Sequence, residues 1–260
     1  MMVNAQRFVA ARELLWSWTL RTIRGRYQQS ALGWLWAVIQ PVTSVAIFTL
    51  IFTRFVPVDT GDVPYAVFSY TAVVPWTLLS ASLSDMTPSL VANMNLVKKI
   101  YFPREILPVA AMLARVMDAG VGVTLLIILM VIFRVPLFFP GLLFLPLIVL
   151  TQLALIVGLG LVLAALNIFY RDVTSLLSLG LQLWFYASPI IYPVTAVPER
   201  LRPYYFLNPM AGILVAYRDV LLYSQLPGAY FYPAVLIAGI TLLVGFWFFK
   251  RVEFLFADIV

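Results

Sequence analysis

The chain has 260 residues, of which 63% are hydrophobic and only 11% are charged, and its formal net charge is +6. An average soluble domain carries about 25% charged residues, and a soluble fold of this length has too little interior to bury so much apolar surface, so the composition predicts an integral membrane protein. The absence of cysteine excludes a disulfide framework, and the absence of histidine removes the commonest general base and metal ligand.

The N-terminal segment precedes the first apolar stretch and carries five arginines, which makes it too long and too charged for the leading region of a signal peptide. Trp16, Leu20, Ile23 and Tyr27 follow helical spacing and share one face. Flanking arginines are Arg12, Arg21, Arg24 and Arg26. This pattern predicts an amphipathic helix over residues 4–31 at the inner membrane surface. The helix either anchors the first span only or also provides a docking surface for a lipid substrate.

Charged residues bracket five apolar stretches, each with at least the roughly 20 residues needed to cross about 30 Å of hydrocarbon, and a shorter uncharged stretch before Arg134 indicates a sixth span. The predicted spans cover residues 34–54, 64–86, 107–133, 142–166, 174–192 and 230–250. No internal repeat and no soluble domain is evident. The fold class predicted is therefore an all-α membrane domain that occupies the whole chain, residues 1–260.

The third span is unusual because only 15 uncharged residues separate Asp118 from Arg134, so Arg115 and Asp118 must lie within it. Their i, i+3 spacing places them on one helix face, where they can neutralise each other. Charges inside a span are costly and often functional. However, Arg115 lies only about 12 Å along the helix from Leu107 and can extend to the interface. The spacing favours a structural ion pair, with a transport site as the alternative.

Lysine and arginine counts give the orientation, because cytosolic loops carry the excess. With the N-terminus inside, eleven such residues face the cytosol and five face the opposite side. The cytosolic set is Arg7, Arg12, Arg21, Arg24, Arg26, Lys98, Lys99, Arg104, Arg171, Lys250 and Arg251. The opposite set is Arg54, Arg134, Arg200, Arg202 and Arg218. Both termini are therefore expected in the cytosol.

The cytosolic loop over residues 92–105 contains the start of the stretch LVKKIYFPREILP. The charge rule explains its lysines but not the apolar triplet of Ile100, Tyr101 and Phe102, and exposed apolar surface rimmed by charge suggests a partner. Pro103 lacks an amide donor, so a short helix is expected to end at Phe102. The candidate docking residues are Lys98, Lys99, Ile100, Tyr101, Phe102, Pro103, Arg104 and Glu105.

The longest non-cytosolic region covers residues 193–229 and contains segments too short to span the membrane. Asn208 followed by Pro209 is a good N-cap and first-turn pair. Two short helices that dip back into the outer leaflet fit this pattern, since such backbone is tolerated where it is buried in protein or lines a cavity. The region is predicted to close an outer exit.

The chain contains 7 tryptophans, 13 tyrosines and 19 phenylalanines. An interfacial belt accounts for many of them, but some lie deeper in the second and fifth predicted spans. Ring faces there offer apolar surfaces along which sugar rings can slide. The candidate channel aromatics are Phe68, Tyr70, Trp76, Trp184, Phe185 and Tyr186.

Two motifs are missing from the sequence. The phosphate-binding pattern GxxxxGK[ST] does not occur, so the chain does not hydrolyse ATP by itself. The spans also lack a carboxylate cluster of the kind that a metal site or a proton relay requires. An enzyme is therefore disfavoured.

Three ordered motifs resemble one family, the type-2 ABC exporter permeases of the polysaccharide branch. RGRYQQSALGWLWAVIQP (residues 24–41) is similar to that branch's approach to the first span. NLVKKIYFPREILP (residues 95–108) resembles its loop between spans two and three, and NPMAGILVAYRDVLL (residues 208–222) resembles its outer region before the last span. The resemblance covers essentially the whole chain. Such permeases export O-antigen, teichoic acid or capsular polysaccharide across the bacterial inner membrane, usually on a lipid carrier.

This resemblance implies that two copies form the channel and that each binds a separate ATPase subunit, which holds ATP and magnesium; the chain itself needs no cofactor. By this resemblance, residues 92–105 correspond to the coupling helix, and residues 4–31 correspond to the interface helix. Arg24 and Arg26 become candidates for contact with a lipid diphosphate headgroup. Residues 193–229 become the exit gate, and the deep aromatics become candidate channel lining.

Three alternatives remain open. The same fold could export a drug, heme or a lipid. An ATP-independent channel or secondary transporter could use Arg115 and Asp118 for coupling and would need no ATPase. A membrane transferase acting on polyprenyl substrates would show activity in the isolated chain.

Overall fold

The computed structural model describes residues 2–27, 35–55, 57–99 and 102–257, and these residues form helices and connecting turns with no strand among them. The longer helices are α1 (Met2–Tyr27), α2 (Trp36–Leu50), α3 (Tyr65–Met86), α6 (Ile106–Ile132), α8 (Leu145–Phe169), α9 (Val173–Tyr186), α11 (Pro209–Leu221) and α12 (Phe231–Val252). The shorter ones are η2 (Ile51–Phe55), α4 (Ser89–Ala92), α5 (Met94–Lys99), α7 (Phe139–Leu142), η3 (Val194–Ala196), η4 (Glu199–Leu201), α10 (Arg202–Tyr205) and η5 (Glu253–Ala257).

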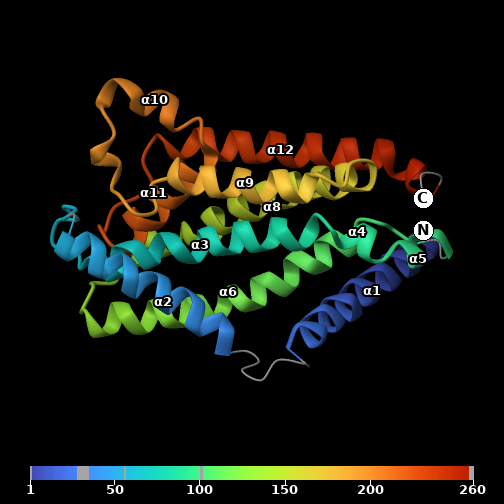
Figure 1. The fold of residues 1–260 in the computed structure, drawn as a ribbon, viewed down its shortest axis with the longest axis horizontal. Coiled ribbons are helices and arrows are strands. Elements are labelled where there is room, and N and C mark those ends of the chain that lie inside the picture. Colours follow the sequence, from blue (N-terminus) through green and yellow to red (C-terminus); the bar gives the residue numbers. More distant parts are fainter. Residues whose placement is uncertain (1, 28–34, 56, 100–101, 258–260) are drawn as a thin grey trace.

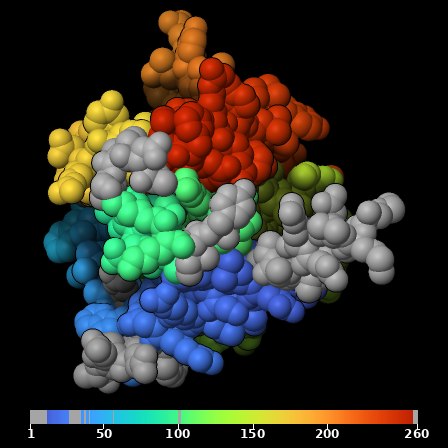
Figure 2. Space-filling view, turned by 90° about the vertical axis from the view of Figure 1, so that its right-hand side faces the viewer, coloured from blue at the N-terminus to red at the C-terminus, as the bar shows by residue number. Residues whose placement is uncertain are grey.

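The helices form an elongated bundle in which α3, α6, α8 and α12 run along the long direction (Figure 1). The two chain ends lie at one end of the bundle with α5, and we call this the terminal end. The other end carries η2, α10 and α11, and we call it the α11 end. Viewed onto the terminal end, α12, the α4–α5 segment and α1 lie side by side (Figure 2).

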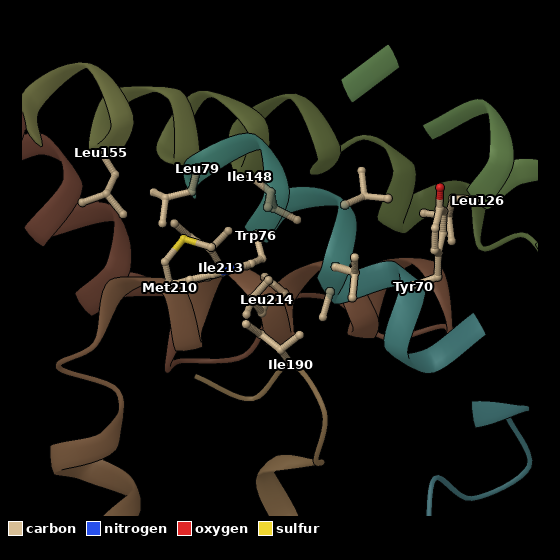
Figure 3. Close-up of a cluster of buried hydrophobic side chains, with 14 of the residues drawn as sticks. Tyr70, Trp76, Leu79, Leu126, Ile148, Leu155, Ile190, Met210, Ile213 and Leu214 are labelled. Atoms are coloured by element: carbon tan, nitrogen blue, oxygen red, sulfur yellow. The ribbon is translucent and has the colours of Figure 1, made fainter. Parts of the chain in front are cut away.

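Helix α3 lies at the centre of the bundle and packs against α2, α6, α8, α9 and α11. Its apolar side chains are buried along almost its whole length, so it has no lipid-facing stripe. In Figure 3, Leu79 of α3 faces Ile148 and Leu155 of α8, with Met210 and Ile213 of α11 close by. The main core is therefore built between the second predicted span and the region predicted to close the outer exit.

Four helices in the described part of the chain are long and apolar enough to cross a membrane: Tyr65–Met86, Ile106–Ile132, Phe139–Phe169 and Phe231–Phe256. They lie at the second, third, fourth and sixth predicted spans. The other two predicted spans correspond to shorter apolar helices, Pro41–Phe55 and Val173–Tyr186. Helix α9 ends early because Pro189 disfavours helix at the residue before it, and its 14 residues reach only about 21 Å. The count of six spans therefore stays a prediction.

Helices α8 and α12 approach closely through two glycines. A Cβ atom on Gly245 would fall well inside contact distance of the Gly158 carbonyl oxygen, and a Cβ on Gly158 would overlap the backbone at Thr241. Small residues allow helices in a membrane to pack backbone against backbone, where dispersion contacts replace the hydrophobic effect as the driving force. This contact fixes the last helix of the chain against the main bundle.

Helix α1 runs obliquely alongside α6 (Figure 1). Among the side chains of α1 that the structure describes, Thr19 is the most deeply buried, and Trp18 packs against a small cluster at the terminal end. Trp16, on the predicted apolar face, is 56% exposed, while Leu20 and Ile23 are half-buried. The buried face is thus rotated from the predicted one, because α1 packs against protein rather than facing only lipid.

Candidate functional site

A cavity with a volume of about 600 Å³ lies between α2, α3, α6, α9 and the last turn of α1. Different parts of its wall carry different kinds of side chain. Charged side chains come from α1 and α6, hydroxyl groups from α2 and α3, and aromatic rings from α2, α3 and α9. The cavity is therefore polar at one part of its wall and aromatic at another.

The charged part of the cavity wall is formed by Arg26, Arg115 and Asp118. With Asp85, which contacts both arginines, they form a cluster that we call the charge quartet: Arg26, Asp85, Arg115 and Asp118. The Arg26 guanidinium lies 2.5 Å from both Asp85 Oδ2 and Asp118 Oδ2. Arg115 donates from Nε to Asp85 Oδ2 at 2.7 Å, from Nη2 to Asp85 Oδ1 at 3.0 Å, and from Nη1 to Asp118 Oδ2 at 3.3 Å. Two positive and two negative charges cancel, so the quartet is neutral as a unit.

The quartet joins three helices. Arg26 comes from the end of α1, Asp85 from the end of α3, and the other two from α6. The expected ion pair of Arg115 and Asp118 is present, and it is one of the four ion pairs within the quartet. Since each side chain retains 18–27% exposure, water reaches the group and lowers the cost of placing charge there.

The hydroxyl part of the wall comes mainly from α3. Thr77, Ser80 and Ser84 line the cavity at i, i+3 and i+7, which places them on one helix face above the quartet. Ser44 faces the same cavity from α2. A row of hydroxyl groups can donate or accept hydrogen bonds without binding any one partner strongly.

The aromatic part of the wall centres on Trp76 and Phe185, whose ring centroids lie 5.7 Å apart in an edge-to-face arrangement. The ring centroid of Phe48 of α2 lies 6.1 Å from that of Phe185, and Phe48 also faces the cavity. Two of the six predicted channel aromatics, Trp76 and Phe185, therefore meet at one cavity.

The other predicted channel aromatics do not line this cavity. Phe68 is buried beneath Arg218, whose guanidinium carbon lies 3.6 Å from the ring centroid. Tyr70 lines a separate apolar cavity. Trp184 contacts Trp76 from the side and donates its indole N–H to Asn208 at 2.8 Å, while Tyr186 is 60% exposed.

The predicted docking segment lies at the terminal end (Figure 2). Helix α5 is described over Met94–Lys99, Ile100 and Tyr101 lie outside the described residues, and Phe102 lies in a bend, so the predicted end of this helix stays a prediction. Phe102 is half-buried against the cluster that contains Phe249 and Phe256, so it is not the freely exposed side chain that the sequence suggested. Lys98, Lys99 and Pro103 are exposed.

Two contacts tie this segment to the C-terminal helix. Glu105 accepts a hydrogen bond from Lys250 of α12 at 2.8 Å, and Lys250 also pairs with Glu253 at 3.1 Å. Arg104 donates to the backbone carbonyl of Glu253. A force applied to residues 94–105 would therefore reach α12 as well as α6.

The predicted headgroup residues of α1 have different surroundings. Arg21 lies over the Trp18 ring at 4.3 Å, Arg24 is exposed, and Arg26 belongs to the quartet. The side chain of Tyr27 lies outside the described residues.

The predicted outer region contains α11 with its expected cap, since the Asn208 side chain accepts a hydrogen bond from the Met210 amide at 3.0 Å. Arg218 of α11 is buried and donates to the carbonyls of Pro189 at 2.5 Å, Ile190 at 2.7 Å and Phe68 at 3.3 Å. This single guanidinium joins α11, the turn after α9 and the start of α3. Tyr217 bonds Gln152 at 3.0 Å, which in turn donates to the Pro75 carbonyl at 2.7 Å.

Three features of the site were missed from sequence. The sequence marks Asp85 only as the boundary of a span, although it falls inside the predicted range 64–86. The i, i+3, i+7 row of Thr77, Ser80 and Ser84 is a polar stripe in an apolar helix and could have been found by its period. The role of Arg218 carries no local signal, because its acceptors are distant backbone carbonyls.

Comparison with known proteins gives the family of the chain. Residues 13–222 match the family model described as ABC-2 type transporter. The chain is 27% identical over 241 residues to the O-antigen export system permease protein RfbA of Klebsiella pneumoniae, covering 93% of this chain and 92% of that protein. It is 27% identical over 235 residues to the protein of the same name from Myxococcus xanthus, with 90% and 88% covered. It is also 24% identical over 207 residues to the polysialic acid transport protein KpsM of Escherichia coli, with 78% and 79% covered. The chain therefore belongs to the ABC-2 type transporter family.

Proposed function

We propose that this chain is the membrane-spanning subunit of an ATP-driven exporter that moves a lipid-linked polysaccharide from the cytosolic side across the bacterial inner membrane. The observation that carries the proposal is the cavity with a hydroxyl row on one wall and Trp76 and Phe185 on another. The names of the relatives, which are export and transport proteins for O-antigen and polysialic acid, support a polysaccharide as the cargo.

The cavity wall suits a sugar chain that must slide rather than stay. Aromatic faces pack against the apolar faces of sugar rings, and hydroxyl side chains exchange hydrogen bonds with successive sugar hydroxyls. Neither kind of contact depends on one particular sugar, so a polymer can advance by one unit and meet equivalent contacts. The charges lie together at the quartet, where Arg26 and Arg115 are balanced by carboxylates and offer no net trap.

The quartet also provides a place for an anionic headgroup. A diphosphate that approached Arg26 would compete with Asp85 and Asp118 for its guanidinium, since both pair types use the same donors. Arg24, two residues before Arg26 on the same helix and exposed, would add attraction before that exchange. In this proposal the headgroup loosens α1 from α3 and α6 when the substrate is loaded.

A second copy of the chain would complete the path. The cavity is bordered by α2 and α9, whose outer faces are apolar and exposed. The exposed side chains are Ile47 and Leu50 on α2 and Leu176, Leu179, Leu183 and Tyr186 on α9. Two such faces brought together would enclose the cavity between two chains, with both termini and the docking segment in the cytosol.

An ATPase subunit would bind at the terminal end through residues 92–105. Lysines project there, and Glu105 and Arg104 connect the segment to α12. Closure of the ATPase would therefore move α6 and α12 together, and the tight α8–α12 contact would carry that movement into the bundle.

The docking proposal is tested by replacing Tyr101 with alanine, because Phe102 is partly used for internal packing. Removal of an aromatic anchor at an interface costs about 2 kcal/mol or more, so recovery of the ATPase with the purified permease should fall by about tenfold or more. Surface polysaccharide should fall with it. The measurement is co-purification from cells that express both subunits.

Phe102→Leu serves as the control, since it keeps an apolar side chain against the same cluster and should leave both readouts near the unchanged protein. If the ATPase still co-purifies normally with the Tyr101→Ala permease, Tyr101 is not part of the docking surface. Export that continues after deletion of the ATPase would instead favour a channel or a secondary transporter.

A further inference from the structure

Two hydroxyl groups in the wall of the polysaccharide cavity have only lone pairs left for a ligand. Ser84 Oγ donates to the Ser80 carbonyl at 2.8 Å, and Ser80 Oγ donates to the Thr77 carbonyl at 3.3 Å. A serine hydroxyl carries one hydrogen and two acceptor lone pairs, so both groups have used their hydrogen within α3. The cavity therefore meets its cargo with acceptors, which suit hydroxyl and amide donors and disfavour the oxygens of a carboxylate or phosphate.

The aromatic part of the wall also favours an uncharged cargo. Trp76 of α3, Phe48 of α2 and Phe185 of α9 line the same cavity. Aromatic rings pack well against the apolar C–H faces of sugar rings. They provide no counter-charge to an anion, so a carboxylate beside them would lose water without gaining an ionic partner.

The arginines at this cavity are already paired. Among the described residues that line it, the two cations are Arg26 and Arg115. Both lie in ion pairs with Asp85 and with Asp118, and Asp118 itself adds a negative charge to the cavity wall. An anion gains a cation here only by displacing an aspartate. The quartet can therefore serve one headgroup by exchange, but it cannot serve a series of charges along a polymer.

The helices beside the cavity bring no further charge to the path. The sequence contains no aspartate, glutamate, lysine or arginine over residues 36–53, 65–84 and 173–198, which include α2, α9 and α3 as far as Ser84. A second copy of the chain would contribute the same helices and so would add no counter-charge. Moving an ionised group from water into such surroundings without a partner is strongly unfavourable.

We propose that the cargo of this cavity is a polysaccharide whose repeating unit is uncharged and rich in hydroxyl or amide donors. The inference rests on the proposed function, since it names the kind of polymer that uses the same path. Each unit donates to Ser80 and Ser84 and packs against the rings, whereas a polymer with an acidic group on every unit would hold several unpaired charges in the path at once. The diphosphate of the carrier differs because it meets the quartet only once per polymer. Asp85 and Asp118 contribute to the specificity by keeping both arginines occupied.

The test compares two probes of equal length that differ only in charge, an oligomer of galacturonic acid and the full methyl ester of the same oligomer. The protein is the full chain with Ala81→Cys, in nanodiscs with its ATPase subunit bound. Ala81 lines the cavity and the chain has no other thiol, so labelling by an uncharged hydrophilic maleimide reports access to the cavity. The ester should halve the labelling rate at a concentration about tenfold or more below that of the free acid, because only the acid brings unpaired charges into the path.

Thr77→Lys places a cation beside the hydroxyl row at an exposed position of the cavity wall. In the Ala81→Cys background it should lower the concentration of free acid needed by about tenfold, as expected for a new charge-assisted contact, with no gain for the ester. Thr195→Cys, exposed in η3 and not part of the cavity wall, is the control, and neither probe should slow its labelling. Thermal unfolding checks that Thr77→Lys folds, and the comparison of acid with ester on Ala81→Cys does not depend on that variant.

The possible outcomes separate this inference from the function on which it rests. Equal protection of Ala81→Cys by acid and ester, or stronger protection by the acid, would overturn the uncharged cargo and leave the cavity as a path for sugar. Protection by neither probe would contradict the polysaccharide path itself, and the inference with it.

Discussion

Replacing Asp85 with asparagine is expected to lower both the yield of folded permease and the export of polysaccharide by about tenfold or more. Asp85 accepts hydrogen bonds from both Arg26 and Arg115, so its loss leaves two guanidinium groups facing one carboxylate. Removing one partner of a buried ion pair costs about 3 kcal/mol or more, and the quartet is close enough to buried for the lower figure to apply. The measurements are the amount of monodisperse protein after extraction and the surface polysaccharide of the cells.

A second substitution distinguishes charge balance from loss of a specific carboxylate. Adding Arg115→Gln to Asp85→Asn makes the cluster neutral again and leaves Arg26 paired with Asp118 at 2.5 Å. The double variant should recover most of the folded protein that the single variant lost. Asp172→Asn, at an exposed position before α9, is the control and should have no effect. A double variant that is no better than Asp85→Asn would contradict the quartet as a balanced unit.

Gly245→Val is expected to have the other large effect. The added side chain would overlap the Gly158 backbone, which cannot move aside as a flexible side chain would, so α8 and α12 must separate. Overpacking of a close contact costs about 1–3 kcal/mol and sometimes more, and a shift of α12 also displaces Lys250 and its contact with Glu105. The midpoint of thermal unfolding in detergent should fall by several degrees, which is about the effect of 2 kcal/mol in a chain of this size.

Gly239→Val provides the matched control on the same helix. A Cβ on Gly239 meets no atom within 4 Å, so valine should be accepted there with little change in the unfolding midpoint. If Gly239→Val and Gly245→Val lowered the midpoint equally, helix propensity rather than the α8–α12 contact would explain the loss.

Much of the fold was predictable from the sequence because its signals are local. Charged residues mark the ends of apolar stretches, and the helices α3, α6, α8 and α12 lie at predicted spans. The Asn208–Pro209 cap was predicted for the same reason, since a capping bond reaches only two residues along the chain. The early end of α9 at Tyr186 was missed, although Pro189 gave a local signal for it.

The candidate site depends on distant residues, and this limited what the sequence could predict. Arg26 reaches Asp85 and Asp118 across 59 and 92 positions, so only the pairing of Arg115 with Asp118 had a local signal. Aromatic residues in the same span also have different surroundings, because a helix turns by about 100° per residue. Trp76 therefore faces the cavity with Phe185, whereas Phe68 lies beneath Arg218.

The docking segment shows the same limit. The sequence predicts Ile100, Tyr101 and Phe102 as one apolar surface for a partner, but Phe102 packs against a cluster that includes Phe249 and Phe256 from the other end of the chain. A cluster that gathers residues so far apart in sequence leaves no pattern within the segment itself.

The proposed function requires that polysaccharide passes through the cavity lined by Ser80 and Trp76. Because the chain contains no cysteine, Ser80→Cys introduces a single thiol without background. Labelling by a small hydrophilic maleimide can be followed in nanodiscs with the ATPase subunit bound, and polymer can be held in place by an ATPase variant that binds but does not hydrolyse ATP. Thr195→Cys, at an exposed position in η3 away from the cavity, reports any general change in access. We expect trapped polymer to slow labelling of Ser80→Cys by about tenfold and to leave Thr195→Cys unchanged, because a bound chain excludes the reagent from the cavity. Equal labelling of Ser80→Cys with and without trapped polymer would contradict passage of the polymer through this cavity.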